Sequence, residues 1–307
     1  DVIFSGSSAR GAVGVAEVKG TTATIKLLDG ILTLEGKTTY SEAAAAKLNG
    51  CLVTVSSYKR DYLTLSKVNG KGASTALNLT TNRMGTKELS AGARFFEQVS
   101  NGRLVEIDRS DITITSIPAN KITYVGYDWA GRVDKLVLND VTGDCYDYGM
   151  IYYRAAGYEE SKDDGSEGSY QNGEIRVTNG SHTDGVSYVV GSVDGAKTNR
   201  MGGVAGSLDQ LDGKNRMAAF MPLNEATGIR RAQFDTDAML LTTNSMVIPI
   251  SDKVECYNKT TGDWFKPGED GDHKAALNLA LAFSDDITVY YDRSPEEGGK
   301  VRIVVVE

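Results

Sequence analysis

The chain has 307 residues, of which 40% are hydrophobic and 24% charged, a composition typical of folded proteins and sufficient for two domains with separate cores. A formal net charge of −8 without a Lys/Arg cluster argues against a nucleic-acid partner, and no apolar run reaches the roughly 18 residues of a membrane-spanning helix, so we expect no membrane insertion. The 34 glycines against 5 prolines, with frequent Val, Ile, Thr and Tyr, favour many short strands and tight turns.

Three cysteines, Cys51, Cys145 and Cys256, are widely spaced and form no C-x-x-C pair. We interpret them as small buried hydrophobic residues. A disulfide between two of the three is the alternative. The chain starts at Asp1, in strand-like sequence and without Met or a signal sequence, which we interpret as a piece of a longer protein.

The first elements are a short strand at Val2–Phe4 and a hairpin over residues 22–36. Asp29-Gly30 provides the two left-handed positions of a type I′ turn. The two-residue loop then places one set of side chains on a shared face, which we expect to be buried: Ile25, Leu27, Leu32 and Leu34.

A short helix follows at residues 41–50. Ser41 can cap its start, four alanines continue it, and Gly50 can adopt the left-handed conformation at its end. Strands at 51–56 and 62–67 form a second hairpin. Strands with one short helix predict a small barrel or rolled sheet over residues 12–68.

After a connector rich in Gly, Ser and Ala at 69–80, strand-like runs predict a second β-subdomain over residues 81–141. It ends in a hairpin whose first strand carries tyrosines and whose turn begins at Asp128. The far end of the chain repeats this pattern, with Asp292 at the equivalent position.

Matches at spacings of 161 to 165 residues extend along the chain: Leu48–Gly50 with Leu211–Gly213, Thr80–Met84 with Thr242–Met246, Ala93–Phe96 with Val254–Tyr257, and Ile122 with Ile287. They predict a tandem duplication of a unit of about 150 residues. The fold class expected is mainly β with a few short helices, each unit being a small barrel or rolled sheet plus a small β-subdomain.

The repeats are expected at 1–148 and 149–307. The second would contain a barrel at 149–235, with an inserted polar, mobile surface loop at 158–173, and a subdomain at 240–307. Residues 274–283 predict a helix. Thr198–Gly202 repeats Thr81–Gly85 letter for letter, but a spacing of 117 residues lies outside the series, and we interpret it as coincidence.

Candidate chemistry is sparse. The chain has two histidines, His182 and His273, both in turn-like sequence, and no G-x-S-x-G motif, so solvated loop histidines are the default. Gly36-Lys37-Thr38 misses the phosphate-loop spacing by one residue. Asp270 and Asp272 offer hard oxygen ligands for calcium but lack the rest of an EF-hand loop. We therefore expect no cofactor other than calcium.

Two further candidates involve binding. Trp129 and Trp264 lie near turns, where they could stack on sugar rings or pack at a hairpin tip or in the core. The terminal strands are apolar and either pair inside the fold or assemble with another chain. The assembly residues would be Val2, Ile3, Phe4, Val301, Ile303, Val304, Val305 and Val306.

Three runs give a family resemblance: VGYDWAGRVDKLVLNDVTGDCYDYGMIYY at 125–153, ISDKVECYNKTTGDWF at 250–265 and DITVYYDRSPEEGGKVRIVVVE at 286–307. They resemble the β-rich repeat regions of large surface proteins with S-layer homology domains from gut Gram-positive anaerobes of the Clostridia type. The resemblance implies an exported, cell-surface segment with a structural or adhesive role, and it brings no catalytic residue. The chain has no recognisable S-layer homology module, so wall anchoring does not carry over.

The function expected is therefore a non-enzymatic structural protein of the bacterial surface, S-layer-associated or part of an extracellular fibre. It would assemble with itself or with other surface proteins through terminal or edge strands. An adhesion module that binds glycan or a host ligand is the alternative, and a surface hydrolase is the third reading.

Overall fold

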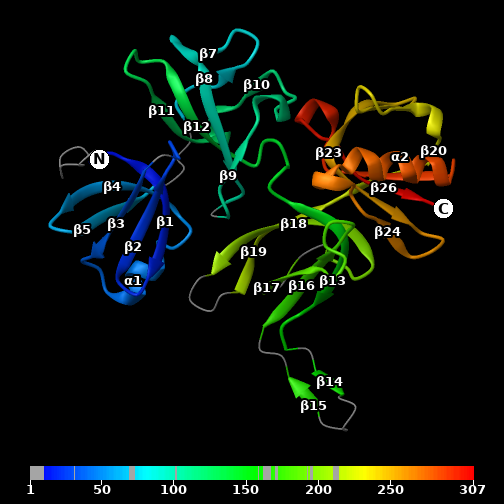
Figure 1. The fold of residues 1–307 in the computed structure, drawn as a ribbon, viewed down its shortest axis with the longest axis horizontal. Coiled ribbons are helices and arrows are strands. Elements are labelled where there is room, and N and C mark those ends of the chain that lie inside the picture. Colours follow the sequence, from blue (N-terminus) through cyan, green and yellow to red (C-terminus); the bar gives the residue numbers. More distant parts are fainter. Residues whose placement is uncertain are drawn as a thin grey trace. The chain divides into compact units, whose positions relative to one another are not determined.

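A computed structural model describes residues 10–30, 32–68, 73–100, 102–157, 159–161, 167–169, 172–191, 193, 196–209 and 214–307. Over these residues the chain is mainly β, with two α-helices. Its strands form two closed five-stranded barrels, two seven-stranded sheets and one separate hairpin (Figure 1). The mainly β fold class predicted from the sequence is thus confirmed, and the arrangement is consistent with duplicated β units.

The first barrel has the strand order β1-β2-β3-β5-β4. Its elements are β1 (Val13–Lys19), β2 (Thr22–Leu27), β3 (Thr33–Thr38), α1 (Glu42–Ala46), β4 (Leu52–Lys59) and β5 (Tyr62–Lys67). The predicted hairpin register is confirmed, because Ile25 pairs with Leu34. Ser41 caps α1 as expected, its side chain accepting a hydrogen bond from the backbone N–H of Ala44.

The first seven-stranded sheet has the order β10-β6-β7-β8-β12-β11, with β9 paired to β8. Its elements are β6 (Leu77–Asn78), β7 (Arg83–Met84), β8 (Lys87–Gln98), β9 (Val105–Ile107), η1 (Arg109–Asp111), β10 (Ser116–Ile117), η2 (Ala119–Lys121), β11 (Ile122–Tyr127) and β12 (Val133–Asn139). The predicted terminal hairpin is β11–β12, and β12 also lies parallel to β8.

The second barrel has the order β13-β16-β17-β19-β18. Its strands are β13 (Asp147–Arg154), β16 (Gly173–Thr178), β17 (Val186–Val190), β18 (Arg200–Asp209) and β19 (Lys214–Pro222). The insertion predicted at 158–173 carries a two-stranded hairpin, β14 (Glu159–Ser161) with β15 (Glu167–Ser169). The barrel's last strand ends at Pro222, so the strands that follow belong to the next sheet.

The second seven-stranded sheet has the order β20-β25-β26-β23-β22-β21, with β24 paired to β23. Its elements are β20 (Asn224–Ile229), η3 (Arg231–Gln233), β21 (Phe234–Asp235), β22 (Leu240–Thr242), β23 (Val247–Asn258), β24 (Asp263–Phe265), η4 (Glu269–Gly271), α2 (His273–Phe283), β25 (Ile287–Tyr291), η5 (Pro295–Glu297) and β26 (Val301–Val306). Helix α2, predicted from the sequence, buries Ala276, Leu277, Ala280 and Leu281, and the last three lie in the same core as residues of β23 and β26.

The central parallel strand pairs of the two sheets have the same register. In the first, β12 pairs in parallel with β8 and shifts register between Val133 and Lys135. In the second, β26 pairs in parallel with β23 and shifts between Val301 and Ile303. The partners of Lys135 and Ile303 are Arg94 and Glu255, which confirms the match predicted at a spacing of 161 residues.

The neighbouring hairpins agree as well. Ile122 pairs with Leu138 in the first sheet and Ile287 with Val306 in the second, as the repeated sequence predicts. The barrels share a detail too. A Cβ added at Gly14 or at Gly149 would lie only 2.3 or 2.2 Å from a backbone carbonyl oxygen of the adjacent strand. Both barrels therefore contain the same close approach of two strands.

One other predicted match does not hold, and another falls on residues that the structure does not describe. Thr80–Met84 includes the turn between β6 and β7, whereas Thr242–Met246 includes the turn between β22 and β23. Residues 211–213, matched to Leu48–Gly50, lie outside the described part of the chain. Polar turn sequences recur because the same backbone conformation requires them, so similarity in turns indicates equivalence less reliably than paired core positions.

The repeated Thr-Asn-Arg-Met-Gly sequence illustrates this. Asn82 and Asn199 both have positive φ, 53° and 61°, and both directly precede a strand. The strands, β7 and β18, belong to different architectures, a sheet and a barrel. Asn tolerates the left-handed conformation better than most residues, so the same local turn appears in two unrelated places.

The C-terminal strand is not an edge strand. Residues 301–306 form β26, which pairs with β25 on one side and β23 on the other, and all six residues are buried. Val301, Ile303, Val304, Val305 and Val306 are therefore core residues, and their prediction as an assembly strand was wrong. The other predicted assembly residues, Val2, Ile3 and Phe4, lie outside the described residues.

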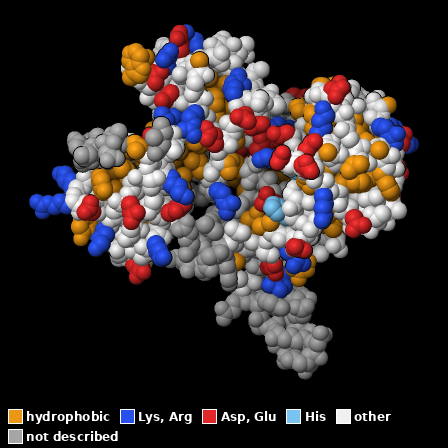
Figure 2. Space-filling model, viewed as in Figure 1, with side chains coloured by type: hydrophobic (Ala, Val, Ile, Leu, Met, Phe, Trp, Pro, Cys, Tyr) orange, Lys and Arg blue, Asp and Glu red, His pale blue; other side chains and the backbone are white. Residues whose placement is uncertain are grey.

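The chain divides into two compact units, the first made of residues 1–141 and 206–218 and the second of residues 142–205 and 219–307. None of the three cysteines forms a disulfide; Cys51 and Cys256 are buried as predicted, and Cys145 is half-buried. No helix in the described ranges is long and apolar enough to cross a membrane. On the face drawn in Figure 2, basic side chains are spread among acidic ones.

Candidate functional site

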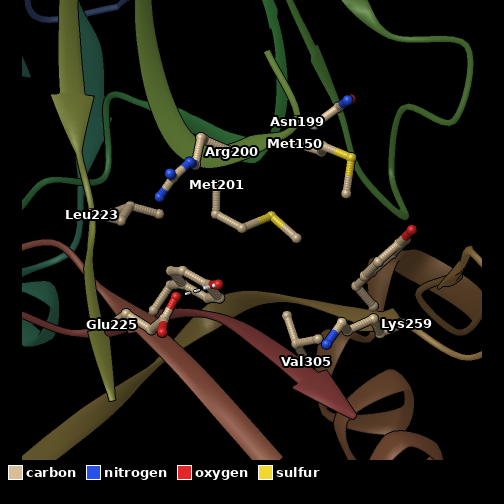
Figure 3. Close-up of a pocket in the computed structure, with 10 residues that line it drawn as sticks. Met150, Asn199, Arg200, Met201, Leu223, Glu225, Lys259 and Val305 are labelled. Carbon is tan, nitrogen blue, oxygen red and sulfur yellow. Dashed lines mark hydrogen bonds between the residues drawn. The ribbon is translucent and has the colours of Figure 1, made fainter. Parts of the chain in front are cut away.

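A pocket of about 360 Å³ lies in the second unit, between strands of its barrel and strands of its sheet (Figure 3). Barrel strands contribute Met150 and Met201, whose side chains point toward the sheet side of the pocket. The complete lining is Met150, Asn199, Arg200, Met201, Leu223, Glu225, Tyr257, Lys259, Tyr290 and Val305. The pocket thus combines an apolar and aromatic surface with charged groups.

The charged groups of this pocket differ in how they are held. The Tyr290 hydroxyl donates to Glu225 Oε2 at 2.7 Å, and burial together with this carboxylate raises the pKa of Tyr290 to about 12. Lys259 Nζ binds Glu307 Oε2 at 2.7 Å. Arg200 is exposed and forms no salt bridge with any residue in the described part of the chain. The guanidinium of Arg200 is therefore available to an anionic group.

A second hollow, of about 240 Å³, contains both histidines. It is lined by Asp144, Tyr146, Asp147, Tyr148, Asn179, Ser181, His182, Ser251, Lys253, Glu255, His273 and Arg302. His273 begins α2, and its Nδ1 lies 3.0 Å from the carbonyl oxygen of Val254. The sequence predicted solvated loop histidines, whereas the structure places both in the lining of one polar cleft.

Glu255 is the buried carboxylate of this cleft. It accepts hydrogen bonds from Ser181 Oγ at 2.6 Å and from the backbone N–H of Gly180 at 3.0 Å. Burial raises the pKa of Glu255, and the Ser181 hydrogen bond and the nearby His273 oppose this shift. His273 Nδ1 lies 3.8 Å from Glu255 Oε1. Ser181 donates its hydrogen bond directly to Glu255 and not to His273, so these three residues do not form a Ser-His-Glu relay.

The best-connected group of the cleft is Arg302, which is only 2% exposed. Its Nη1 donates to Asp144 Oδ1 at 2.7 Å, and its Nη2 donates to Asp292 Oδ2 at 3.0 Å and to the carbonyl oxygen of Thr142 at 2.6 Å. The guanidinium also lies over the ring of Tyr148, 4.8 Å from its centroid. Burial raises the pKa of Tyr148 well above its ordinary value.

This network joins β26 to the chain entering β13, and Lys300 adds two contacts to Asp144 at 3.3 Å. A buried ion pair is costly unless every member has partners, and here each carboxylate accepts from several donors. We name Arg302, Asp144, Asp292 and Lys300 the arginine cluster. Its geometry is that of a fixed connection between the barrel and the sheet of one unit.

The two predicted glycan-stacking residues belong to different units, Trp129 to the first and Trp264 to the second. Trp129 is 96% exposed at the tip of the β11–β12 hairpin, where Asp128 accepts hydrogen bonds from the backbone of Ala130 and Arg132. Trp264 is half-buried, and its ring packs 4.9 Å from that of Tyr257. The exposed ring of Trp129 can therefore contact a ligand or partner, whereas the ring of Trp264 packs against Tyr257.

The two predicted calcium ligands, Asp270 and Asp272, lie at and just before the start of α2. Asp272 caps α2 by accepting from the backbone N–H of Ala275 at 3.1 Å, and Asp270 lies in η4 with a positive φ of 57°. Within the ranges that the structure describes, no three or more His, Cys, Asp or Glu side chains are grouped to hold a metal ion.

Sequence reasoning missed the arginine cluster and the two hollows, because their residues are far apart in the chain. One signal was present: Arg302 interrupts an otherwise apolar strand. A charge in the middle of a buried strand requires a partner, which here comes from residues 144 and 292. Comparison with known proteins adds no assignment, since no family model, curated protein or solved structure matches the chain.

Proposed function

We propose that the chain is a non-enzymatic structural segment of a bacterial cell-surface protein. The observation that carries the proposal is the repeated sheet centre, in which a parallel strand pair with the same register shift occurs twice, each time following a five-stranded barrel. Repetition of a folded unit extends a protein without requiring a new chemical site. The resemblance to the repeats of S-layer homology proteins supports the surface location.

The polar interior of the second unit supports the same role. Asp144 and Asp292 are held by Arg302 and Lys300, and Glu255 is held by Ser181 and Gly180. Catalytic carboxylates of a hydrolase converge on a shared substrate position, with a separation that fits attack at one bond. Here hydrogen-bond donors of the protein bind the carboxylates, which favours a role of these groups in folding stability over a role in catalysis.

Protease treatment of intact cells that produce the chain tests its location. We expect mass spectrometry to find peptides of this chain in the released fraction, at a yield similar to that of a known surface protein. A cytoplasmic protein serves as the control for lysis. Release of this chain only together with the cytoplasmic control would contradict the proposal.

Ligand binding is the second candidate function, favoured by Arg200, which forms no ion pair with a described residue and lines the pocket of Figure 3 together with Tyr290 and Tyr257. A guanidinium next to aromatic and methionine side chains suits an acidic sugar, whose carboxylate would bind Arg200 and whose apolar face would contact the rings. Calorimetry with glucuronic acid oligosaccharides tests it: we expect Arg200→Ala to weaken binding at least tenfold. Absence of binding to the unmodified chain would exclude this ligand class.

A further inference from the structure

In each unit, a side chain at one and the same sheet position binds the barrel. In the first unit Arg94 Nη1 donates to the carbonyl oxygen of Leu28 at 2.8 Å. In the second unit Glu255 Oε2 accepts from the backbone N–H of Gly180 at 3.0 Å. Arg94 and Glu255 are equivalent, because each is the first residue of its strand to pair after the shared register shift. We call these two contacts the Arg94 junction and the Glu255 junction.

The barrel residues of the two junctions are equivalent as well. In the first barrel, a Cβ added at Gly14 would meet the carbonyl oxygen that lies two residues before Leu28. In the second barrel, a Cβ added at Gly149 would meet the carbonyl oxygen that lies two residues before Gly180. Leu28 and Gly180 therefore have the same place in their barrels, after the end of β2 and of β16. One junction thus occurs in both units with opposite polarity, a cation in the first and a carboxylate in the second.

The Arg94 junction has a constant charge. Arg94 also donates to both carboxylate oxygens of Glu106, at 2.7 and 2.8 Å. The hydrogen bonds between the two side chains raise the pKa of Arg94 and lower the pKa of Glu106. Both groups therefore keep their charge from pH 5 upward.

The Glu255 junction is compensated differently. Glu255 is only 6% exposed, and its oxygens accept from neutral donors, Ser181 Oγ and the Gly180 N–H. Its cationic neighbours are the imidazoles of His273, whose Nδ1 lies 3.8 Å from Glu255 Oε1, and of His182. Imidazole is the side-chain group that ordinarily gains or loses its charge between pH 5 and 8. The charge balance of this junction therefore changes in a range where that of the Arg94 junction is constant.

The turn at residues 179–182 is formed within the barrel and fits closely against the sheet. The His182 N–H donates to Asn179 Oδ1 at 2.7 Å, and the Asn179 side-chain amide donates to a backbone carbonyl oxygen of β13 at 2.9 Å. A Cβ added at Gly180 would lie 2.3 Å from the carbonyl oxygen of Phe265 in β24. The turn thus has its own internal hydrogen bonds, and the buried carboxylate adds a polar attachment to the sheet.

The other titratable groups of the cleft do not change charge in this range. They are Asp144, Tyr146, Asp147, Tyr148, Lys253 and Arg302. Aspartate, tyrosine, lysine and arginine side chains ordinarily titrate outside the interval from pH 5 to 8. Burial raises the pKa of the Cys256 thiol, next in sequence to Glu255, so this group stays neutral. The titration of the junction therefore belongs to Glu255 and the two histidines.

We propose that the Glu255 junction is a pH-sensitive switch, which holds the turn at 179–182 to the sheet in weak acid and releases it as the pH rises. The Arg94 junction stays closed over the same range. Rising pH removes either the proton of Glu255 or the positive charge of a neighbouring imidazole. Either loss leaves a poorly compensated carboxylate in a buried position, and release of the turn hydrates it. Arg302 keeps its charge, so the arginine cluster holds the barrel while the turn is released.

The direction of the switch agrees with the effect of burial. Burial raises the pKa of Glu255, so the closed junction binds the proton more tightly than an open, hydrated one. Protonation therefore favours the closed junction, and deprotonation favours the open one.

Hydrogen exchange of the whole chain, followed by NMR, tests the switch. The protection factor of the Gly180 amide compares its exchange rate with the intrinsic rate at the same pH, and it reports opening of the junction. We expect this factor to fall at least threefold between pH 5 and pH 8. The Leu28 amide, which donates to the Val13 carbonyl oxygen at 3.1 Å, is the reference at the equivalent place in the first barrel. Its protection should stay constant.

Two variants identify the titrating groups. Glu255→Gln has no titrating carboxyl group, but its amide oxygen can still accept from the Gly180 N–H, so we expect the pH dependence at Gly180 to disappear. His182→Gln removes one of the two imidazoles at an exposed position and leaves Glu255 in place. Release should then begin at a lower pH than in the unmodified chain.

Amides of β26 distinguish release of the turn from unfolding of the sheet, and at pH 8 they should stay better protected than Gly180. Four results would overturn the inference: a Gly180 protection factor that does not fall with pH, an equal fall at Leu28, a fall that persists in Glu255→Gln, or equal exchange of Gly180 and β26. A pH dependence unchanged by His182→Gln would remove the imidazoles from the switch. None of these results bears on where the chain resides in the cell, which the protease experiment decides separately.

Discussion

At the scale of single residues, the arginine cluster is the feature most sensitive to substitution. Replacing Arg302 by Met would remove the guanidinium that binds the carboxylates of Asp144 and Asp292, leaving Lys300 as the basic partner of Asp144. We expect the free energy of unfolding to fall by about 3–5 kcal/mol, as for other broken buried ion pairs. Urea denaturation measures this change.

Arg83→Met is the matched control, since both side chains of the Arg83–Glu88 pair are exposed. It should cost less than about 1 kcal/mol. Equal costs for Arg302→Met and Arg83→Met would show that the arginine cluster does not hold the second unit together.

Glu255 predicts a pH dependence of stability. Because burial raises its pKa above the ordinary value of 4.5, the folded chain retains the proton over a pH interval in which the unfolded chain has lost it. The stabilising contribution is complete below pH 4.5 and is lost as the pH rises through the folded-state pKa. His182 and His273 face this carboxylate, and their positive charges oppose the rise in its pKa.

Glu255→Gln removes the titrating group. We expect the free energy of unfolding of the unmodified chain, minus that of Glu255→Gln, to decrease as the pH rises above 4.5. Denaturant titrations at a series of pH values give this difference. A difference that grows with pH would mean that the folded state stabilises the ionised form of Glu255, contrary to the effect of its burial.

Individual functional residues were the hardest to predict from the sequence. The cap at Ser41 and the turn at Asp128 follow from local conformational rules, and the structure has them where expected. The hairpin around Asp29-Gly30 is present, but only Gly30 has a positive φ, 73°, so its turn is not the predicted type I′. Among the partners of Arg302, Asp292 lies 10 residues away, whereas Asp144 and Thr142 lie 158 and 160 residues away. Gly180 lies 75 residues from Glu255. No local pattern could identify these distant partners.

At the scale of elements, the repeated close approach of two strands in each barrel can be tested. An added methyl at Gly14 or Gly149 would meet a carbonyl oxygen of the neighbouring strand. We expect Gly14→Ala and Gly149→Ala each to lower the free energy of unfolding by about 1–3 kcal/mol, through forced backbone shifts. Thermal and urea unfolding measure both.

Gly92→Ala, in β8, is the control, because no atom lies within 4 Å of the added Cβ. Its effect should stay within about 0.5 kcal/mol. Tolerance of alanine at only one of Gly14 and Gly149 would indicate that the two barrels are not built alike.

Strands and helices were predicted well where the apolar pattern is strong, as in the 22–36 hairpin and in α2. The position of a strand within its sheet, at an edge or in the centre, was not predicted. The apolar run at 301–306 is compatible with an exposed assembly strand and with a central one, and only the pairing of β26 on both sides decides between them. A continuous apolar run in fact favours burial on both faces, as in other parallel strand pairs.

At the scale of the whole molecule, each unit has its own hydrophobic cores. We therefore expect the loss of stability in Arg302→Met to be confined to the second unit. Hydrogen exchange should accelerate for amides of β23 and β26 and stay unchanged for those of β8 and β12. Equal acceleration in both sheets would show that the chain unfolds as one cooperative body.

A repeated β architecture that serves as a structural segment of a surface protein must be found outside the cell. Immunogold electron microscopy of intact cells that make the chain, with antibodies raised against the folded protein, measures this location. We expect gold particles along the outer surface, on a continuous layer or on filaments. Gold confined to the cell interior, with an unlabelled surface, would contradict it.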